Sequence, residues 1–446
     1  MSSKLKPVLE LDVGETMQQM RLVPMTIDGK RAFLVVHSNS GNIDPWPPYF
    51  TFPTDTLKLA AFDADGHKLW RKDLGPGVVP GIWFCPIMPF DLDGDGTDEV
   101  YLVANPDPDH PLDGRTPALQ QLSAATGEPL KSLPCAKVQD RQPLSHLWRN
   151  FLASGFSAGR RRLITAQGTY GLMQLQCWDE SFNCLWSIKT DPDESPGALG
   201  SHMFPVVDID GDGRDELLWG ERCLDIDTGQ EIWVGDREKW HGHSDIVQPT
   251  LDLTTGKWFI YTCRESRNPA EARGVVMYDD HGRELWGYRG LGHMHAGWVG
   301  RLCDDGSHLC YAFDMDSQKH YCYDTSGHPQ HPAFPLNRSL PVDFDGDGLH
   351  EVVYTSKENR GRVLRRDGQE ICTLAGKPCC CGHILDMPGE QIVTWPKYDR
   401  GTVARIYSLP SATDTPAARR RFEHPFYKSS LQMWAVGYNW RNASGV

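Results

Sequence analysis

The amino-acid sequence predicts an all-β fold, a single β-propeller of about eight four-stranded blades spanning residues 1–446. Two hairpin patterns alternate along the chain, and their repeat length is typical of four-stranded propeller blades. No long apolar stripe with the 3.6-residue period of a helix interrupts them. A ring of seven blades, with one weak repeat being an insertion, is the alternative.

The first pattern is a pair of apolar segments joined by a short acidic or glycine-containing turn, as in two adjacent antiparallel strands. A clear example is MFPVVDIDGDGRDELLWG, which begins at Met203. Successive copies begin between 42 residues (Leu340 to Gly382) and 66 residues (Met20 to Pro86) apart. The copies begin at Met20, Pro86, Leu152, Met203, Ile246, Trp298, Leu340 and Gly382.

The second pattern is a shorter hairpin with an Asp/Gly turn and a final tryptophan. Its clearest copies end at Trp70, Trp186, Trp233 and Trp286. One hairpin of each kind makes a four-stranded blade, which cannot bury both of its faces alone and therefore packs between neighbours. The segment KPVLELDV, residues 6–13, is expected to complete the last blade and close the ring.

Three of the first-pattern turns share the spacing D-x-D-G-D-G-x-x-E. Carboxylates at positions 1, 3 and 5 converge on one point, and calcium accepts six to eight such oxygens. The repeat therefore predicts structural calcium, with an ordinary acidic surface turn as the alternative. The expected ligands are Asp91, Asp93, Asp95 and Glu99; Asp208, Asp210, Asp212 and Glu216; and Asp343, Asp345, Asp347 and Glu351.

Polar residues that flank the innermost strands are expected to gather at one mouth of the propeller axis. Two histidine pairs open consecutive blades, in WHGHSD (Trp240–Asp245) and GHMHAGW (Gly292–Trp298). Histidines and arginines there would form a positive pocket on a protein of formal net charge −14, which suits an anionic sugar. The acidic balance argues against a nucleic-acid partner, because phosphate backbones need lysine and arginine.

The Asp-rich turns with WHGHSD and GHMHAGW resemble propeller-fold polysaccharide lyases, namely rhamnogalacturonan lyases of family eleven and ulvan and rhamnose–glucuronate lyases. The segment from Gly242 to Asp245 is similar to the family-eleven pattern G-H-G-D, with serine in place of the second glycine. The turns also resemble the calcium loops of FG-GAP propellers. The resemblance implies β-elimination at a uronic acid in a rhamnose-rich oligo- or polysaccharide, with calcium structural or also catalytic.

The elimination needs a base, a group that neutralises the uronate carboxylate and an acid for the leaving oxygen. The base expected under this resemblance is His243, with His202 or His295 next. Arg264, helped by Arg222, is expected to bind the carboxylate, since guanidinium binds it bidentately. Tyr288, Tyr261 or a second histidine is the expected acid. Further substrate contacts are expected from His146, His241, His293, Trp298 and Arg338.

Three other interpretations stay open at this point. The chain could be a non-catalytic, calcium-dependent propeller that binds glycans or proteins. It could be a hydrolase using Glu221 and Glu265 as paired carboxylates. Zinc could bind Cys379–Cys381 and His383 with the distant Cys322, although adjacent cysteines do not easily ligate one ion.

The N-terminal residues lack the apolar segment of a secretory signal, and no apolar run reaches membrane-spanning length. The sequence thus favours a cytoplasmic protein without a membrane partner, or a secreted one if a leader has been removed. A cytoplasmic lyase would meet imported oligosaccharides, so action on short chains is expected. Neither the exact glycan nor the oligomeric state follows from the sequence.

Overall fold

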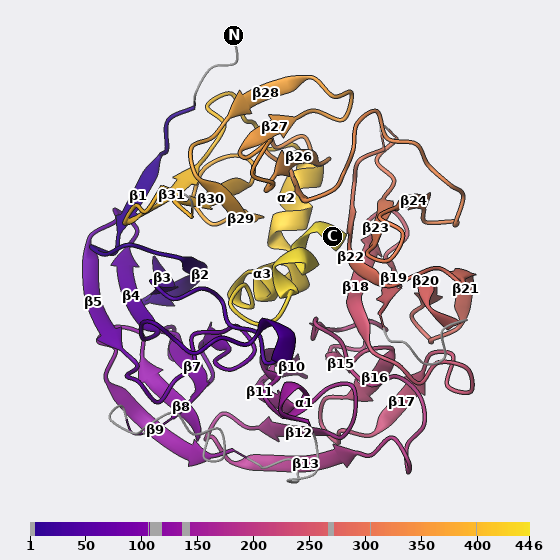
Figure 1. Ribbon diagram of the computed structural model, residues 1–446, viewed down its shortest axis with the longest axis horizontal. Helices are drawn as coiled ribbons and strands as arrows, with labels where there is room; N and C mark the ends of the chain where they lie inside the picture. The colour runs from indigo at the N-terminus through magenta and orange to yellow at the C-terminus, as the bar shows by residue number, and fades with distance from the viewer. Residues whose placement is uncertain are drawn as a thin grey trace.

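The computed structural model describes residues 5–105, 107, 118–135, 143–265, 272–303, 305–397 and 399–446. Eight separate antiparallel sheets stand side by side in a ring around a central axis (Figure 1). Each sheet is one blade, with the strand starting at the axis followed outward by the next strands of the chain. The all-β propeller is therefore confirmed, with eight blades rather than seven.

The inner two strands of each blade are the predicted first-pattern hairpins. Blades 1 to 4 contain, from the axis outward, β2 (Gln19–Ile27), β3 (Lys30–Ser38), β4 (Lys58–Asp63) and β5 (Lys68–Asp73); β6 (Ile87–Phe90), β7 (Glu99–Ala104), β8 (Ala118–Ser123) and β9 (Pro129–Pro134); β10 (Asn150–Ser157), β11 (Arg160–Gln167), β12 (Met173–Trp178) and β13 (Cys184–Thr190); β14 (Val206–Val207), β15 (Glu216–Leu218), β16 (Arg222–Asp225) and β17 (Glu231–Val234).

Blades 5 to 8 continue the ring, and blade 6 has three strands within the described residues. Their strands are β18 (Ser244–Asp252), β19 (Lys257–Arg264), β20 (Gly274–Asp279) and β21 (Glu284–Arg289); β22 (Met294–Gly300), β23 (Leu309–Asp314) and β24 (His320–Asp324); β25 (Ser339–Val342), β26 (Glu351–Tyr354), β27 (Arg362–Leu364) and β28 (Glu370–Thr373); β29 (Lys377–Gly382), β30 (Gln391–Trp395), β31 (Val403–Tyr407) and β1 (Leu9–Asp12).

The ring is closed by the N-terminal strand, as the sequence predicts. Strand β1 pairs antiparallel with β31, with Leu9 opposite Ile406 and Asp12 opposite Val403. Blade 8 thus combines three late strands with the first strand of the chain. This pairing satisfies the exposed edge that β31 would otherwise present.

The repeated tryptophan of the second pattern joins neighbouring blades. The indole Nε1 of Trp70 donates to the carbonyl of Ala124 in the outer turn of the next blade, at 2.7 Å. Gly127 of that turn has φ +73°, and a Cβ there would lie 2.6 Å from the indole ring. The same donor and glycine contacts recur at Trp186 with Ile226 and Gly229, Trp233 with Asp280 and Gly282, and Trp286 with Thr325 and Gly327. The sequence repeat therefore encodes the blade-to-blade contact.

A helical tail, which the repeat analysis did not predict, fills the centre of the ring. It consists of α2 (Pro416–Glu423), α3 (Pro425–Gln432) and the 3-10 helix η3 (Asn439–Gly445), and it contacts the inner strands β2, β18 and β22 (Figure 1). Thr415 caps α2 by accepting from the Ala418 amide, and proline stands at the first position of α2 and of α3. We call residues 416–445 the plug.

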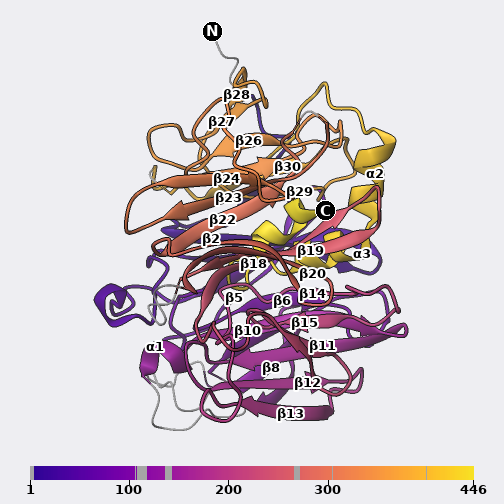
Figure 2. The same ribbon diagram turned by 90° about the vertical axis from the view of Figure 1, so that its right-hand side faces the viewer.

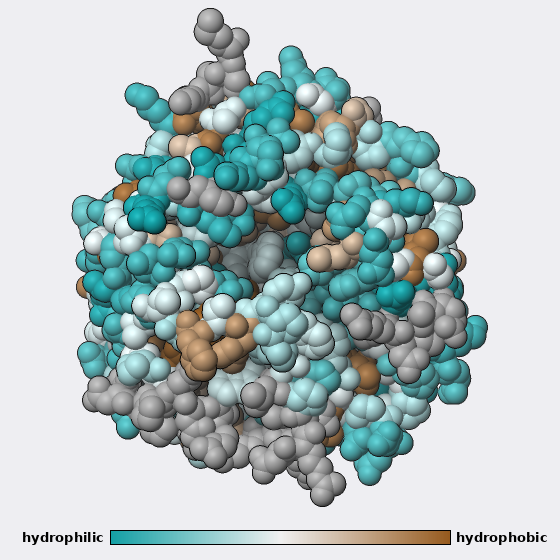
Figure 3. All heavy atoms as spheres, viewed as in Figure 1, coloured by the Kyte–Doolittle hydropathy of each residue, from teal (hydrophilic) through white to brown (hydrophobic). Residues whose placement is uncertain are grey.

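The two faces of the ring differ. The short helix α1 (Leu144–Leu147) belongs to the insertion before blade 3, and η1 (Pro47–Tyr49) belongs to the insertion between β3 and β4 of blade 1. Helices α2 and α3 lie toward the opposite face from α1 (Figure 2). No helix among the described residues has the length and apolarity needed to cross a membrane. On the α1 face, a central hollow opens at the axis (Figure 3).

Candidate functional site

The predicted histidines meet at the mouth on the α1 face because the inner strands of blades 4 to 6 begin there. His202 lies in the loop before β14, and His243 precedes β18. Two irregularities aim further side chains at the same point: the pairing of β18 shifts register at Asp245, and that of β22 shifts at His295. A β-bulge re-aims a side chain in this way.

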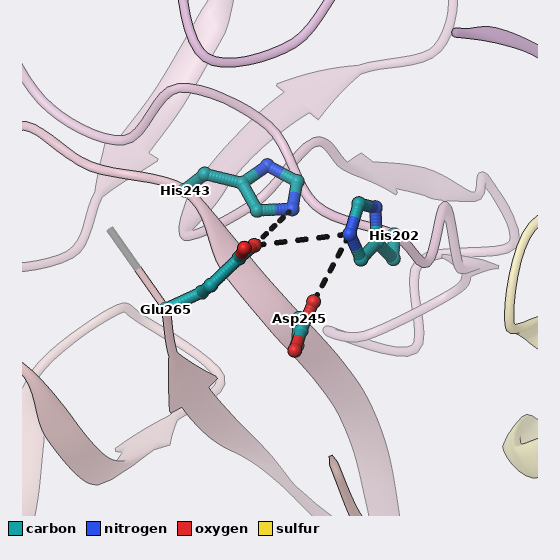
Figure 4. Close-up of side chains that lie close together, drawn as sticks. All are labelled: His202, His243, Asp245 and Glu265. Atoms are coloured by element: carbon teal, nitrogen blue, oxygen red, sulfur yellow. Dashed lines mark ion pairs between the residues drawn. The ribbon is translucent and has the colours of Figure 1, made fainter. Parts of the chain in front are cut away.

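Four of these side chains form a compact cluster (Figure 4). His202 Nε2 lies 3.0 Å from Asp245 Oδ1 and 3.7 Å from Glu265 Oε2, and His243 Nε2 lies 3.5 Å from the same Glu265 oxygen. We call His202, His243, Asp245 and Glu265 the mouth cluster. One ligand atom from each lies within 4.8 Å of all the others.

Two histidines of blade 6 extend the mouth cluster toward solvent. His295 Nδ1 lies 3.1 Å from Asp245 Oδ2, and His293 Nε2 lies 3.4 Å from Glu265 Oε1. The side chain of His295 is 41% exposed, whereas those of His243 and Asp245 are fully buried. His295 is therefore the member of this group that a ligand reaches first.

The environment fixes the protonation preferences of the group. Burial lowers the pKa of His243 to about 3, so its ring is neutral. Burial, with the nearby charge of Asp245, raises the pKa of Glu265 to about 7. The hydrogen bond to Asp245 raises the pKa of His295. Neutral imidazoles beside buried carboxylates are a donor set that fits a divalent cation.

Tyr170, which the sequence analysis missed, covers the mouth cluster. Its hydroxyl donates to Glu265 Oε2 at 2.7 Å, and its ring stacks on His243 with centroids 4.0 Å apart. Its backbone has φ +66°, a left-handed conformation that is strained for an aromatic residue and that clusters at functional sites. It follows β11 by three residues, and only this backbone strain, invisible in the sequence, marks it.

The long insertion between β3 and β4 of blade 1 also reaches this region. Asp44 of that insertion lies 3.4 Å from Arg149 Nη2 and accepts from Trp83 Nε1 at 3.1 Å. The Arg149 guanidinium lies over the rings of Trp83 and Tyr170, at 4.8 and 5.5 Å from their centroids. The insertion thus braces one wall of the mouth.

The expected carboxylate-binding role of Arg264 does not agree with its position. Its guanidinium is fully buried and pairs with Glu221 at 2.7 Å and Asp236 at 3.0 Å. It ends β19 next to Glu265, and neighbouring strand residues point to opposite faces. Glu265 therefore enters the mouth while Arg264 points into the blade. Glu221 is saturated by the same contacts, which removes the paired-carboxylate site expected for a hydrolase.

Three other expected residues also lie outside the mouth cluster. Arg222 is fully buried in β16, pairs with Glu231 and donates to the Ser195 carbonyl at 2.9 Å. Tyr288 lies on β21, the outermost strand of blade 5, and its hydroxyl donates to the Gly327 carbonyl. It lies far from the mouth because the fourth strand of a blade forms the rim of the ring. Trp298 is only 2% exposed and packs in the blade core against Leu309, Tyr311 and Leu336.

The remaining expected contacts have different surroundings. His146 stacks on Tyr170 with centroids 5.4 Å apart, so it borders the mouth cluster. His241 and Arg338 are exposed, the latter before β25 of blade 7. The zinc alternative is not assembled, because Cys322 lies on β24 of blade 6, whereas Cys379–Cys381 lie on β29 of blade 8. His383 stacks on Phe422 instead.

The first and second Asp-rich turns bring their carboxylates together, at the ends of the inner hairpins away from the mouth. Ligand atoms of Asp91, Asp93 and Asp95 lie within 4.8 Å of one another, and so do those of Asp208, Asp210 and Glu216. Burial, followed by the neighbouring aspartates, raises the pKa of Glu216 to about 8. These two turns are possible acidic metal-binding sites.

Arginines neutralise the third turn. Arg365 lies 3.0 Å from Asp345, Arg366 lies 3.1 Å from Asp347, and Arg421 of the plug lies 3.0 Å from Asp343. A shared motif thus has two different surroundings, because the first two turns lack an arginine from the plug among the described residues.

The fold and the site define a β-propeller protein with a histidine–carboxylate centre at one mouth of its axis. The chain belongs to rhamnogalacturonan lyase family 11, because the profile described as "Rhamnogalacturonan lyase family 11, C-terminal domain" matches residues 151–445. This range contains the mouth cluster and its extension by His293 and His295.

Individual relatives agree with this family. The chain is 27% identical to rhamnogalacturonan endolyase YesW of Bacillus subtilis (strain 168) over 86% of its length, and it covers 66% of that relative. It is 24% identical to rhamnogalacturonan exolyase YesX of the same organism over 88% of its length, covering 70% of that relative. The chain therefore spans about two thirds of these relatives. A solved rhamnogalacturonan lyase of Bacillus licheniformis superposes with a TM-score of 0.79 at 18% identity, covering 98% of this chain and 80% of the other, which shows the shared fold.

Proposed function

We propose that this protein is a lyase that cleaves rhamnogalacturonan, an anionic glycan, by β-elimination at galacturonate. Its family membership supports the reaction class, and the mouth cluster with the adjacent His295 supports a base and a cation site at one mouth of the axis. In the reaction a base removes the proton on C5 of the uronate. Its electron pair forms the C4–C5 double bond, the C4–oxygen bond breaks, and the departing oxygen takes up a proton.

His295 is the proposed base, and its position carries the proposal. Its Nδ1 is held by Asp245 at 3.1 Å, which orients the ring and leaves Nε2 directed away from that carboxylate. A carboxylate that holds one imidazole nitrogen in this way prepares the other to accept a proton. His243, the first choice from sequence, is fully buried behind Tyr170 and beside Thr169, whose hydroxyl lies 2.6 Å from its Nδ1.

The mouth cluster is the proposed site of a divalent cation. His202, His243, Asp245 and Glu265 would hold the ion, which when bound would add positive charge near the substrate carboxylate. The all-oxygen sets of the first two Asp-rich turns suit calcium, with Asp91, Asp93 and Asp95 in one and Asp208, Asp210 and Glu216 in the other. Tyr170 orients Glu265 and limits the access of water.

The test follows the ultraviolet absorbance of the conjugated unsaturated uronate during incubation with rhamnogalacturonan. We expect absorbance to rise with wild-type protein and the rate to fall at least about 100-fold in His295→Gln, as for loss of a general base. His281→Gln is the matched control, because His281 is an exposed histidine in a turn of blade 5. Wild-type protein that binds rhamnogalacturonan without any rise in absorbance would contradict the proposed reaction.

A further inference from the structure

Arg441, in the 3-10 helix η3 of the plug, has a cationic side chain that the described residues leave uncompensated. Its Nε and Nη1 atoms are buried and lack a hydrogen-bond partner, although the residue as a whole remains partly exposed. No carboxylate of the described residues lies within ion-pair distance of it. A guanidinium in this state costs free energy unless an anion joins it.

The backbone of Arg441 is fixed, so this arrangement is not that of a loose surface chain. Its carbonyl accepts from Gln248 Nε2 at 2.7 Å and from the Ser444 hydroxyl at 2.9 Å. Its guanidinium lies over the rings of Tyr438 and Trp440, 5.3 and 5.5 Å from their centroids. These contacts hold the cation in place before any ligand arrives.

The side chain of Arg441 belongs to the same mouth. Gln248 lies on β18, the strand whose second residue is Asp245, and η3 contacts both β18 and β22. The ring of Tyr438, over which the Arg441 guanidinium lies, is 5.1 Å from the ring of His202 between centroids, so a single aromatic ring separates Arg441 from the mouth cluster. The cation is therefore close enough to act on the proposed base and on a ligand beside it.

Three other buried arginines near the mouth already pair with carboxylates. Arg264 pairs with Glu221 and Asp236, and Arg222 pairs with Glu231. Arg149 pairs with Asp44, is only 4% exposed and lies against two aromatic rings. Among these four arginines, Arg441 alone combines partial exposure with the absence of a carboxylate partner among the described residues.

We infer that Arg441 binds the carboxylate of the uronate at the cleavage site, the role that the sequence had suggested for Arg264. This inference rests on the proposed function for the identity of the sugar. Two parallel N–H donors of the guanidinium match a carboxylate and stabilise the charge that spreads onto it when the C5 proton leaves. Arg441 is then a catalytic residue, and its place in the plug makes the tail part of the active site.

The first experiment compares lyase rates of Arg441→Gln, Arg441→Lys and Arg283→Gln. We expect kcat/KM to fall about 100-fold or more in Arg441→Gln, as for removal of one preorganised donor to a developing negative charge. Arg441→Lys should keep part of the activity, because lysine keeps the charge but not the paired donors. Arg283→Gln, an exposed arginine in an outer turn, should match wild type.

The second experiment measures binding, so that it does not depend on catalysis. The probe is a galacturonate–rhamnose disaccharide whose galacturonate carries no sugar on O4 and is therefore not cleaved. Its partner is the same disaccharide with the carboxylate reduced to an alcohol. Calorimetric titration should show wild type preferring the acid at least about tenfold, as for a charge-assisted hydrogen bond, and Arg441→Gln showing no preference.

The outcomes separate the inference from the proposed reaction. An undiminished preference for the acid in Arg441→Gln overturns the inference, even if wild-type protein is an active lyase. A preference that depends on Arg441 in a wild-type protein without lyase activity supports the carboxylate site and overturns the reaction instead. Should Arg441→Gln fail to fold, Arg441→Lys decides, because a full wild-type rate in that variant contradicts bidentate binding.

Discussion

Two arginines of the plug, the buried Arg421 and the partly exposed Arg441, both lie over aromatic rings but differ in their polar partners. Arg421 donates from Nε to the Val446 carbonyl, from Nη1 to Asp343 and from Nη2 to Glu390. Tyr427 donates to the same Glu390 oxygen, and His350 lies 3.0 Å from Nη2. Arg441 has none of these partners. The α2 end of the plug thus contains an arginine whose charge is fully paired, and the η3 end contains an arginine without a carboxylate partner among the described residues.

The difference between Arg421 and Arg441 indicates whether a charged side chain in the interior serves stability or ligand binding. A buried charge that pairs only with protein groups is costly to remove, because its partners are left as unpaired buried charges. A charge without an ionic partner adds no ion pair to the fold, and we attribute the retention of Arg441 to the ligand proposed above. Stability and function should therefore separate cleanly between the two ends of the plug.

The largest expected effect comes from removing the fully paired Arg421. Arg421→Met should lower the free energy of unfolding by about 3–5 kcal/mol, because Asp343 and Glu390 lose their counter-ion in a buried site. Arg441→Met should leave it unchanged within about 0.5 kcal/mol or raise it. Urea unfolding followed by circular dichroism measures both. Equal losses in the two variants would break the comparison.

The second effect concerns activity without stability. Glu265→Gln should reduce the lyase rate about 100-fold, roughly 2.7 kcal/mol in the barrier, because it removes a charge of the mouth cluster and the acceptor of Tyr170. Its unfolding free energy should change by less than about 1 kcal/mol. Glu284→Gln on the rim strand β21 is the control. A Glu265→Gln protein with normal rates would place the chemistry elsewhere.

His37 shows a third way to bury an ionisable group, which is to give up its charge. It is fully buried, both ring nitrogens lack hydrogen bonds, and burial lowers its pKa to about 4 from 6.5. His37 is therefore protonated below about pH 6.5 in the unfolded chain but only below about pH 4 in the folded protein. Stability should fall by about 2 kcal/mol between pH 6.5 and 5 through this group.

The measurement is the pH dependence of unfolding in wild type and His37→Gln, with His67→Gln as an exposed control on the same blade. The fall between pH 6.5 and 5 should be about 2 kcal/mol smaller in His37→Gln and unchanged in His67→Gln. Parallel curves for all three proteins would show that His37 does not titrate as described.

The smallest expected effect is on calcium-dependent stability, and it distinguishes the first two Asp-rich turns from the third, which arginines neutralise. Calcium at tenfold excess over its Kd should stabilise the protein by about 1.4 kcal/mol for each site. Asp210→Asn should weaken this response, whereas Asp345→Asn should not, because Arg365 already neutralises Asp345. Thermal unfolding with calcium and with a chelator tests the pair. A response that disappears in Asp345→Asn would show that the arginines do not replace the ion.

The fold was predictable because its signals are local and repeated. Every inner hairpin carries its own acidic or glycine-containing turn, and the Trp-and-Gly pattern follows from a contact between adjacent blades. The plug was not predicted because its sequence occurs only once in the chain. Nothing in Pro416–Glu423 indicates that this helix enters the ring. Ring closure by β1 was predictable, since residues 6–13 read as a strand without a blade of its own.

The site was only partly predictable. His202, His243, His293 and His295 were found because residues that precede inner strands meet at one mouth. Arg264 was misassigned because its direction depends on strand alternation next to Glu265. Tyr170 and Arg441 were missed, because the first depends on a left-handed backbone in a loop and the second on the packing of the plug.

Closure of blade 8 by β1 has a consequence for synthesis on the ribosome. Leu9 leaves the ribosome long before Ile406, its partner, is made. The nascent chain must therefore carry an incomplete ring with open strand edges until β31 emerges, and such edges invite pairing with other chains. Arg441 follows β31 in the chain, so a growing polypeptide gains its substrate-binding cation only after the ring is able to close.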